Sequence, residues 1–255
     1  MACDQLLNAH SIFTFDCHPG ISCFTDCCND VEMTLYPYDM IRLKNRFKMD
    51  SETFLEKYTE MVFDEGVWFP HLTLKMASNN ACPFLTKNGC SVYEDRPFSC
   101  RSYPLARSVK RAYSPDKQEE KYYLVRHDYC RGHEAPRQWL LSEWIDKSGL
   151  KVFNNMNSQW ITIYTILKSY PFESTGMNMN FFRLLFCASY NTDNFRMLMD
   201  TCLTDEMNIS KELIEKARSS DIHLMQVGFA FIHYCLTGEC MNNLGRAHSQ
   251  KVGLF

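Results

Sequence analysis

The sequence has no long block of lysine and arginine. Its 255 residues carry 27 Lys and Arg against 30 Asp and Glu, for a net charge of −3. The electrostatic footprint of a nucleic-acid-binding protein is therefore missing, and we expect no nucleic-acid partner. The stretch around Lys110, Arg111 and Lys117 is basic, but Glu119 and Glu120 follow it, which indicates a solvated loop.

Long apolar runs are missing as well, and no stretch approaches the ~18 consecutive apolar residues of a membrane span. The longest candidate, "MQVGFAFIHYCL" at 225–236, is interrupted by Gln226, His233 and Tyr234 and is predicted to be a buried helix. Residues 1–22 lack the basic segment and apolar run of a secretory signal. We therefore expect a cytoplasmic protein without a membrane span, in which clustered cysteines more often bind metal than form disulfides.

Glycine is scarce, with 10 residues, and no G-x-G-x-x-G occurs. The sequence also shows no Ser–His–Asp order and no paired-carboxylate site, so it identifies no catalytic residue. Hydrophobic residues, by contrast, make up 45% of the chain and include 18 Phe and 13 Tyr. A chain of this composition can fill a core without disulfide staples.

Cysteine is plentiful, with 13 residues, and eight of them fall in three turn-rich segments. These segments are "FDCHPGISCFTDCC", with the spacing C-x5-C-x3-C-C, then "CPFLTKNGCSVYEDRPFSC", and finally "DYCRG". Cysteine used as hydrophobic filler would not gather in turns rich in Pro and Gly. We predict that these eight cysteines are metal ligands: Cys17, Cys23, Cys27, Cys28, Cys82, Cys90, Cys100 and Cys130.

The other cysteines show no close spacing, and all but the first lie in apolar helical segments. Cysteine in such positions commonly acts as a small buried hydrophobe. We expect that structural role for Cys3, Cys187, Cys202, Cys235 and Cys240.

Several thiolates together suit zinc, iron–sulfur clusters or copper(I). Zinc sites usually show two C-x2–4-C pairs, and here only Cys23 and Cys27 have that spacing. Iron–sulfur clusters accept more irregular loops, and adjacent Cys27 and Cys28, whose disulfide would be strained, could serve two metal ions. A 4Fe–4S cluster on four of the eight thiols is therefore favoured, with zinc or a second centre on the others. A zinc centre alone, or a disulfide framework in an exported protein, is the alternative.

The hydrophobic patterns predict an α+β fold that is mostly α. We expect a cysteine-rich module at 1–135 with a small antiparallel β element, and a helical region of unknown role at 136–255. In the module, helices are predicted at 37–47 and at 50–61, the second capped by Asp50, and strands at 68–76 and 121–127 are predicted to pair. Six further helices are expected at 136–148, 157–170, 180–190, 194–200, 210–219 and 221–236.

Taken together, the cysteine segments resemble the CxxCxxCC family of cysteine-cluster proteins, which are thought to chelate zinc or iron. The resemblance spans roughly residues 13–144 and rests on "CPFL", on C-x-x-Y-E-x-R-P-x-x-C-R-x-Y-P and on the "CC" pair. It implies a metal or iron–sulfur centre at the eight cysteines. The opening is longer than the usual C-x2-C-x2-C-C and is similar to that of flagellin lysine methylases, which are thought to use an iron–sulfur centre with S-adenosylmethionine.

The resemblance also points to residues beside the thiols. Arg96 and Arg101 flank Cys100 within the family's "RP" and "CR" pairs, and a guanidinium there would offset the charge of several thiolates. Pairing with Glu94 or Asp95 is the equally weighted alternative for both arginines. Further candidates are Tyr93 and Tyr103 as walls of the centre, and His18, His71, His127 and His133 as replacement ligands.

Three functional classes remain open at this point. The centre could be structural or redox-active in a binding protein whose helical half docks a protein partner. The chain could instead be an enzyme, for example a methyltransferase acting on a protein lysine, with a cofactor pocket between its two halves. The third class is a zinc-stabilised interaction module.

Overall fold

The structure is a computed structural model that describes residues 5–111, 118–170 and 179–241. It is α+β and mostly α, as the sequence predicts. The helices in chain order are α1 (Pro37–Phe47), α2 (Ser51–Tyr58), α3 (Phe98–Ser102), α4 (Leu141–Lys147), α5 (Leu150–Ser169), α6 (Met179–Ser189), α7 (Thr192–Cys202), α8 (Lys211–Ala217) and α9 (Asp221–Thr237).

The strands are short and form four small antiparallel sheets. Two sheets have three strands each, in the orders β1-β9-β8 and β3-β5-β4, and two are the pairs β10-β2 and β6-β7. The strands are β1 (Gln5–Leu7), β2 (Ile12–Thr14), β3 (Thr34–Leu35), β4 (Thr59–Val62), β5 (His71–Leu74), β6 (Leu85–Thr86), β7 (Gly89–Cys90), β8 (Leu105–Arg111), β9 (Gln118–Leu124) and β10 (Gln138–Leu140).

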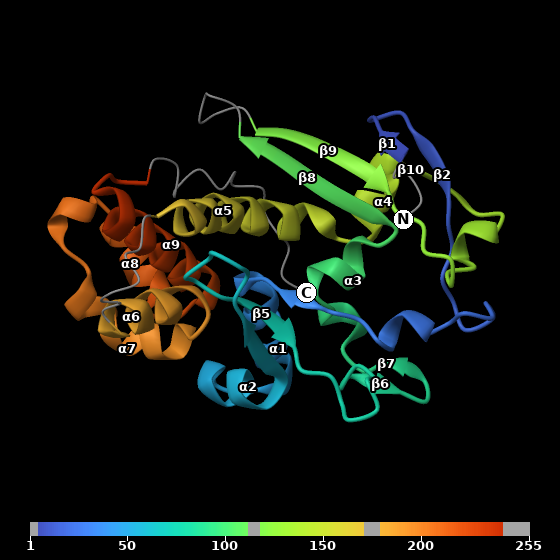
Figure 1. Ribbon diagram of the computed structural model, residues 1–255. Coiled ribbons are helices and arrows are strands. Elements are labelled where there is room, and N and C mark those ends of the chain that lie inside the picture. Colours follow the sequence, from blue (N-terminus) through green and yellow to red (C-terminus); the bar gives the residue numbers. More distant parts are fainter. Residues whose placement is uncertain (1–4, 112–117, 171–178, 242–255) are drawn as a thin grey trace.

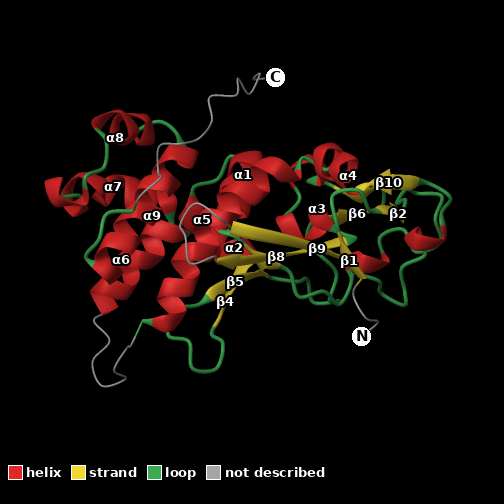
Figure 2. Ribbon diagram, turned by 90° about the horizontal axis from the view of Figure 1, so that it is seen from above, coloured by secondary structure: helices red, strands yellow, loops and turns green. Residues whose placement is uncertain are grey.

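Helix α5 spans the middle of the molecule (Figure 1). The helices α6 to α9 gather at one end of it, and the β8–β9 hairpin lies over the other end, beside α3 and α4. The view from above shows the same division, with the loops around β2, β6 and β10 at the end opposite to α6–α9 (Figure 2). The cysteine-bearing loops therefore lie away from the C-terminal helices.

Two hydrophobic cores hold these elements together. The larger core joins side chains of α1, α2, β3 and β5 to side chains of α5 to α9, so both predicted parts of the chain contribute to it. The smaller core lies between β1, β2, β8, β9 and α4 and contains Phe13, Phe15, Leu105, Leu124 and Leu141. Burial of these apolar surfaces is the main driving force for the fold.

Helix α9 confirms that 225–236 is a buried helix, because Leu224 to Ile232 are all buried. Its Gly228 allows a close approach to α6, since a Cβ at this position would lie 2.1 Å from the carbonyl oxygen of Ala188. Within the described ranges, no helix is long and apolar enough to cross a membrane.

The predicted pairing of 68–76 with 121–127 is wrong. Strand β5 pairs with β3 and β4, whereas β9 pairs with β1 and β8. Each of the two three-stranded sheets uses a partner close in the chain, because β4 directly follows α2 and β8 forms a hairpin with β9. Short alternating segments indicate which face of a strand is buried, but not which strand lies beside it.

Further segments differ from the predictions: helix α5 begins at Leu150 rather than at 157, and the short helix α3 was not predicted. Helix α2 begins after the predicted cap Asp50, which accepts a hydrogen bond from the Thr53 N–H, but it ends at Tyr58 and the chain continues as β4. Residues 138–140 form β10, so α4 begins at Leu141 rather than at 136. Lys110 and Arg111 belong to β8 instead of a loop, and Lys117 lies outside the described residues.

Candidate metal centre

The first cysteine segment is attached at its start to the loop that carries Cys130. Strand β2 pairs with β10, and the Asp16 N–H then donates to the Gly132 carbonyl over 3.0 Å. A Cβ at Gly132 would lie 2.5 Å from the Asp16 carbonyl oxygen and 2.7 Å from the Phe15 ring. Glycine is therefore required here for the two segments to approach each other.

The same segment is attached at its end to the loop that carries Cys82. The Cys82 N–H donates to the Cys28 carbonyl over 2.8 Å, and an isolated bridge joins Asn29 to Ala81. Cys27 and Cys28 lie in the short turn of 3-10 helix directly before this junction. The adjacent cysteine pair is thus fixed by backbone hydrogen bonds to the second cysteine segment.

Cys90 and Cys100 are positioned by the elements that follow. Cys90 lies on β7, paired with Leu85 on β6, and the Leu85 N–H donates to the Cys82 carbonyl over 3.0 Å. Cys100 lies in α3, whose first residue, Phe98, donates its N–H to the buried carboxylate of Asp39 over 2.9 Å. The Cys100 Sγ lies 3.6 Å from the Met33 Sδ.

Mutual electrostatic effects show which thiols are neighbours. The pKa of Cys17 is raised to about 11 by burial and then by the thiols of Cys27, Cys130 and Cys23. The pKa of Tyr129 is raised by burial and by the same Cys27, Cys130 and Cys23 thiols. Cys23 Sγ also accepts a 3.1 Å hydrogen bond from the N–H of Arg131, next to Cys130. Cys17, Cys23, Cys27 and Cys130 therefore lie near one another.

A second group of thiols also lies near the pair. Burial, followed by the thiols of Cys82, Cys27 and Cys90, raises the pKa of Cys100 to about 12. The pKa of Cys82 is also raised, by burial first and then by Cys90. The pKa of Cys28 is raised by its hydrogen bond with Cys27, by burial, and by the charges of Cys27, Cys82 and Cys100.

Cys27 and Cys28 join the two groups. The interaction between their side chains lowers the pKa of Cys27 and raises that of Cys28, so Cys27 loses its proton more readily than Cys28. Cys27 raises the pKa of thiols in both groups, whereas Cys28 responds to Cys82 and Cys100. The adjacent pair therefore lies near both groups of cysteines.

The donor set fits a soft or borderline metal. All eight thiols are free. Burial and mutual repulsion raise the pKa of most of them and so favour the protonated form. A bound cation would stabilise the thiolates and release these protons. Within the described residues, no three His, Cys, Asp or Glu side chains converge closely enough to form a ready-made metal site. Metal binding would therefore require small movements of the cysteine loops.

Aromatic side chains line the region beside Cys130. The His127 ring stacks on both Tyr103 and Tyr129, with ring centroids 5.6 Å and 5.2 Å apart. Burial and the neighbouring Cys130 thiol raise the pKa of Tyr103 well above its usual range, and its hydroxyl lies 3.1 Å from His133 Nε2. The structure therefore places Tyr103 at this wall, and it adds Tyr129, which the sequence pattern did not single out.

The remaining candidate residues have other partners. The His18 Nδ1 accepts a hydrogen bond from the Gly20 N–H, and His71 pairs with Asp64 at 3.6 Å. The exposed Tyr93 ring lies under the guanidinium of Arg96, which is 4.0 Å from the ring centroid.

The two arginines of the second segment differ in their surroundings. Burial raises the pKa of the Cys90 thiol, and the positive charge of the nearby Arg96 opposes part of that rise. The guanidinium of Arg101 is buried, donates to the carbonyls of Ser148 and Glu94, and lies over the Phe153 ring. Arg101 thus ties α3 to the start of α5.

The cysteines expected to be structural lie in the helical half. Cys187, Cys202 and Cys235 pack against the larger core, and the Cys240 Sγ donates to the Glu206 carbonyl over 3.2 Å. Cys3 lies outside the described residues.

The cysteine-rich part of the chain matches the model of a protein family. No curated protein and no solved structure matches the chain significantly. The residues that carry the cysteine loops, from the end of β2 to the Cys130 loop, do match a family model that includes all eight cysteines. That model, matched over residues 16–131, is the one of the CxxCxxCC family and is described as a putative zinc- or iron-chelating domain.

Proposed function

We propose that this chelating domain holds two metal centres, at least one of them a 4Fe–4S cluster. The first set of ligands is Cys17, Cys23, Cys27 and Cys130, and the second is Cys28, Cys82, Cys90 and Cys100. The observation that carries the proposal is the adjacent pair Cys27 and Cys28, which is shared between two groups of thiols from different segments. Four thiolates complete the ligand set of a 4Fe–4S cluster or of a structural zinc ion.

Packing supports the division into two sets. Cys130 packs against the smaller core, together with Tyr103. Cys82 and Cys90 pack against the larger core. Members of the two sets therefore pack against different cores.

Charge supports a role for Arg96 at the second set. Its guanidinium stabilises the thiolate of Cys90, and four thiolates carry more negative charge than one dication offsets. Arg101 contributes to the same set by holding Cys100 in place, because its hydrogen bonds to the carbonyls of Ser148 and Glu94 fix the helix that carries Cys100. Free thiols in this number are maintained in a reducing compartment, which favours a cytoplasmic location.

The direct test is purification without oxygen, followed by a visible spectrum and by iron, zinc and sulfide analysis per chain. We expect brown protein with about four iron and four sulfide per cluster. Colourless protein with stoichiometric zinc and no sulfide would overturn the cluster, and protein with neither metal would overturn both centres.

Paired variants test the division into sets. Cys17→Ser with Cys130→Ser should remove the metal of the first set alone, and Cys90→Ser with Cys100→Ser that of the second. Cys240→Ser, which changes a thiol in the helical half, is the matched control and should keep all metal. If either double variant loses every metal atom while the protein remains folded by circular dichroism, the thiols form one centre rather than two.

A further inference from the structure

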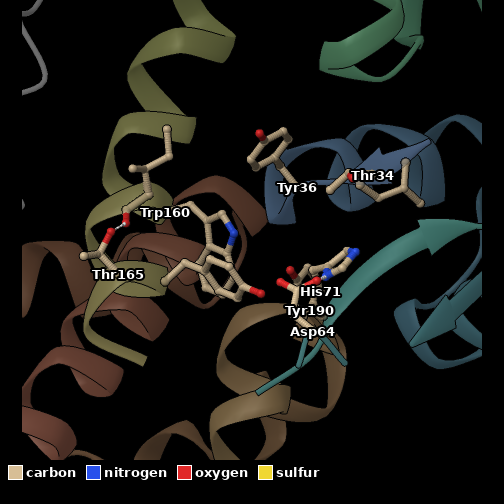
Figure 3. A pocket seen from close by; sticks show the side chains of 10 residues that line it. Thr34, Tyr36, Asp64, His71, Trp160, Thr165 and Tyr190 are labelled. Atoms are coloured by element: carbon tan, nitrogen blue, oxygen red, sulfur yellow. Dashed lines mark hydrogen bonds and ion pairs between the residues drawn. The ribbon is translucent and has the colours of Figure 1, made fainter. Parts of the chain in front are cut away.

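A separate cavity of about 290 Å³ lies between the two parts of the chain, and no cysteine lines it. Its size is close to the lower end of the range for small-molecule sites. Figure 3 shows Trp160 of α5 on one side and Tyr36, next to β3, on the other, with Asp64, His71 and Tyr190 completing the walls. The cavity is thus built from the β3–β5 sheet and from the helical half together.

Four of the ten residues that line the cavity are Tyr or Trp. Trp160 and Tyr190 are almost fully buried, and their rings meet edge to face at 70° with centroids 5.3 Å apart. Tyr164 continues the wall, with its ring 5.7 Å from that of Trp160. Two aromatic walls at a steep angle, together with Tyr36 opposite, resemble the cages that hold organic cations.

A carboxylate completes the set of groups. Asp64 lines the cavity, and its side chain is 42% exposed. Burial is the main cause of the raised pKa of Tyr164, and the negative charge of Asp64 is the second cause. A carboxylate beside aromatic faces attracts an ammonium group by charge and by the quadrupole of the rings.

The chain's own Lys168 shows how such a group is held. Its Nζ lies 3.4 Å from the Asp64 Oδ2 and 5.2 Å from the centroid of the Tyr164 ring. The Lys168 side chain is 44% exposed, so it can leave this position at little cost in packing. An ammonium group therefore already contacts two of the residues that line the cavity, Asp64 and Tyr164.

We propose that this cavity binds a small organic ammonium ion, which displaces the Lys168 side chain from Asp64. The methyl or methylene groups of the ligand would contact Trp160, Tyr164 and Tyr190, and its positive charge would face Asp64. A quaternary ammonium suits the site best, because it is weakly hydrated and gives up little solvation on entering an aromatic cage. This site is independent of the metal centres.

Choline and its uncharged isostere 3,3-dimethylbutan-1-ol are the probes that separate charge from shape. Binding is measured by isothermal titration calorimetry on the full-length, metal-loaded protein, and the site is located by the NMR shift of the assigned Trp160 indole N–H. We expect choline to bind about tenfold more tightly than the isostere, which corresponds to ~1.4 kcal/mol. Equal affinity for the two probes would overturn the ammonium proposal.

Substitutions of Asp64 and Lys168 should have opposite effects on the affinity for choline. Asp64→Asn removes the carboxylate and should weaken choline binding about tenfold, whereas Lys168→Gln removes the competing ammonium and should tighten it. Lys151→Gln, which breaks an exposed pair with Asp146 elsewhere on the surface, is the matched control and should leave the affinity unchanged. If choline binds neither the unaltered protein nor Lys168→Gln, the proposal is also overturned.

Discussion

The backbone N–H of Cys82 donates to the carbonyl of Cys28 over 2.8 Å. This hydrogen bond joins two cysteine segments that are separated in the sequence by α1, α2 and the β3–β5–β4 sheet. It brings the Cys27–Cys28 pair beside Cys82, from which the chain continues to Cys90 and Cys100. The shared pair at the proposed metal centres depends on this contact.

Gly132→Ala should separate the first cysteine segment from the Cys130 loop. The added Cβ would lie 2.5 Å from the Asp16 carbonyl oxygen, a backbone atom that cannot move aside without disturbing the β2–β10 pairing. We expect the variant to lose metal from the first set of cysteines while it keeps metal on the second. Metal analysis before and after gel filtration measures this.

Gly238→Ala is the matched control for that substitution. Gly238 caps α9 at φ 71°, and a Cβ added there would meet no atom within 4 Å. Alanine would therefore cost only the strain of a residue with a Cβ in the left-handed backbone conformation. It should lower the melting temperature slightly and leave the metal content unchanged. Equal metal loss in both glycine variants would show that the loss follows stability and not the Gly132 contact.

Asp39→Asn should loosen the helix that carries Cys100. The carboxylate of Asp39 is fully buried, and its two oxygens accept from the N–H groups of Tyr36 and Phe98, both over 2.9 Å. An amide has one oxygen, so one buried N–H group would lose its acceptor, at a cost of about 1–3 kcal/mol. Urea unfolding should show this loss, and a chelator should remove metal from the variant faster than from the unaltered protein. Unchanged chelation kinetics would show that Asp39 does not position Cys100.

Lys44→Ala should destabilise the contact between the two parts of the chain. The Lys44 ammonium is nearly buried and pairs with Asp193 at 2.9 Å and with Asp221 at 3.1 Å. Its removal leaves two partly buried carboxylates without their shared cation, which typically costs about 3–5 kcal/mol. The free energy of unfolding in urea measures the effect. Lys216→Ala, which breaks the exposed pair with Glu212, should change it little.

Asp221 should make the stability depend on acid pH. Burial raises the pKa of its carboxyl, but the hydrogen bond from Asn45 and the charges of Lys44 and Arg196 outweigh burial, so the pKa is lowered overall. A lowered pKa in the folded state means that the stabilisation is present above the unfolded-state pKa of about 4 and is lost as the pH falls through the folded-state value. The difference in unfolding free energy between the unaltered protein and Asp221→Asn should therefore be largest near neutral pH and shrink below about pH 4. A difference that stays constant down to pH 2 would contradict this assignment.

Local patterns in the sequence were sufficient to predict most of the helices and the kind of donor atom that the cysteine segments offer. The apolar spacing of Met40, Leu43 and Phe47 predicted α1, and Asp50 marked the start of α2, because helix periodicity and capping act within a few residues. The eight cysteines in turn-rich segments predicted a metal-chelating domain, since the kind of donor atom is a property of the residue itself.

Those local patterns could not predict the contacts between segments that are distant in the sequence. The partners of β5 and β9, the buried carboxylate of Asp39 at the start of α3, the wall residue Tyr129 and the aromatic cavity around Trp160 all arise from residues far apart in the chain. Short strands and single polar residues carry no local signal for their partners, because burial and hydrogen bonding choose among many alternatives only when the whole chain packs. For this protein, the sequence determined which donor atoms are available for a metal, because thiols belong to the residues themselves, and tertiary packing decided which of those thiols lie near the Cys27–Cys28 pair.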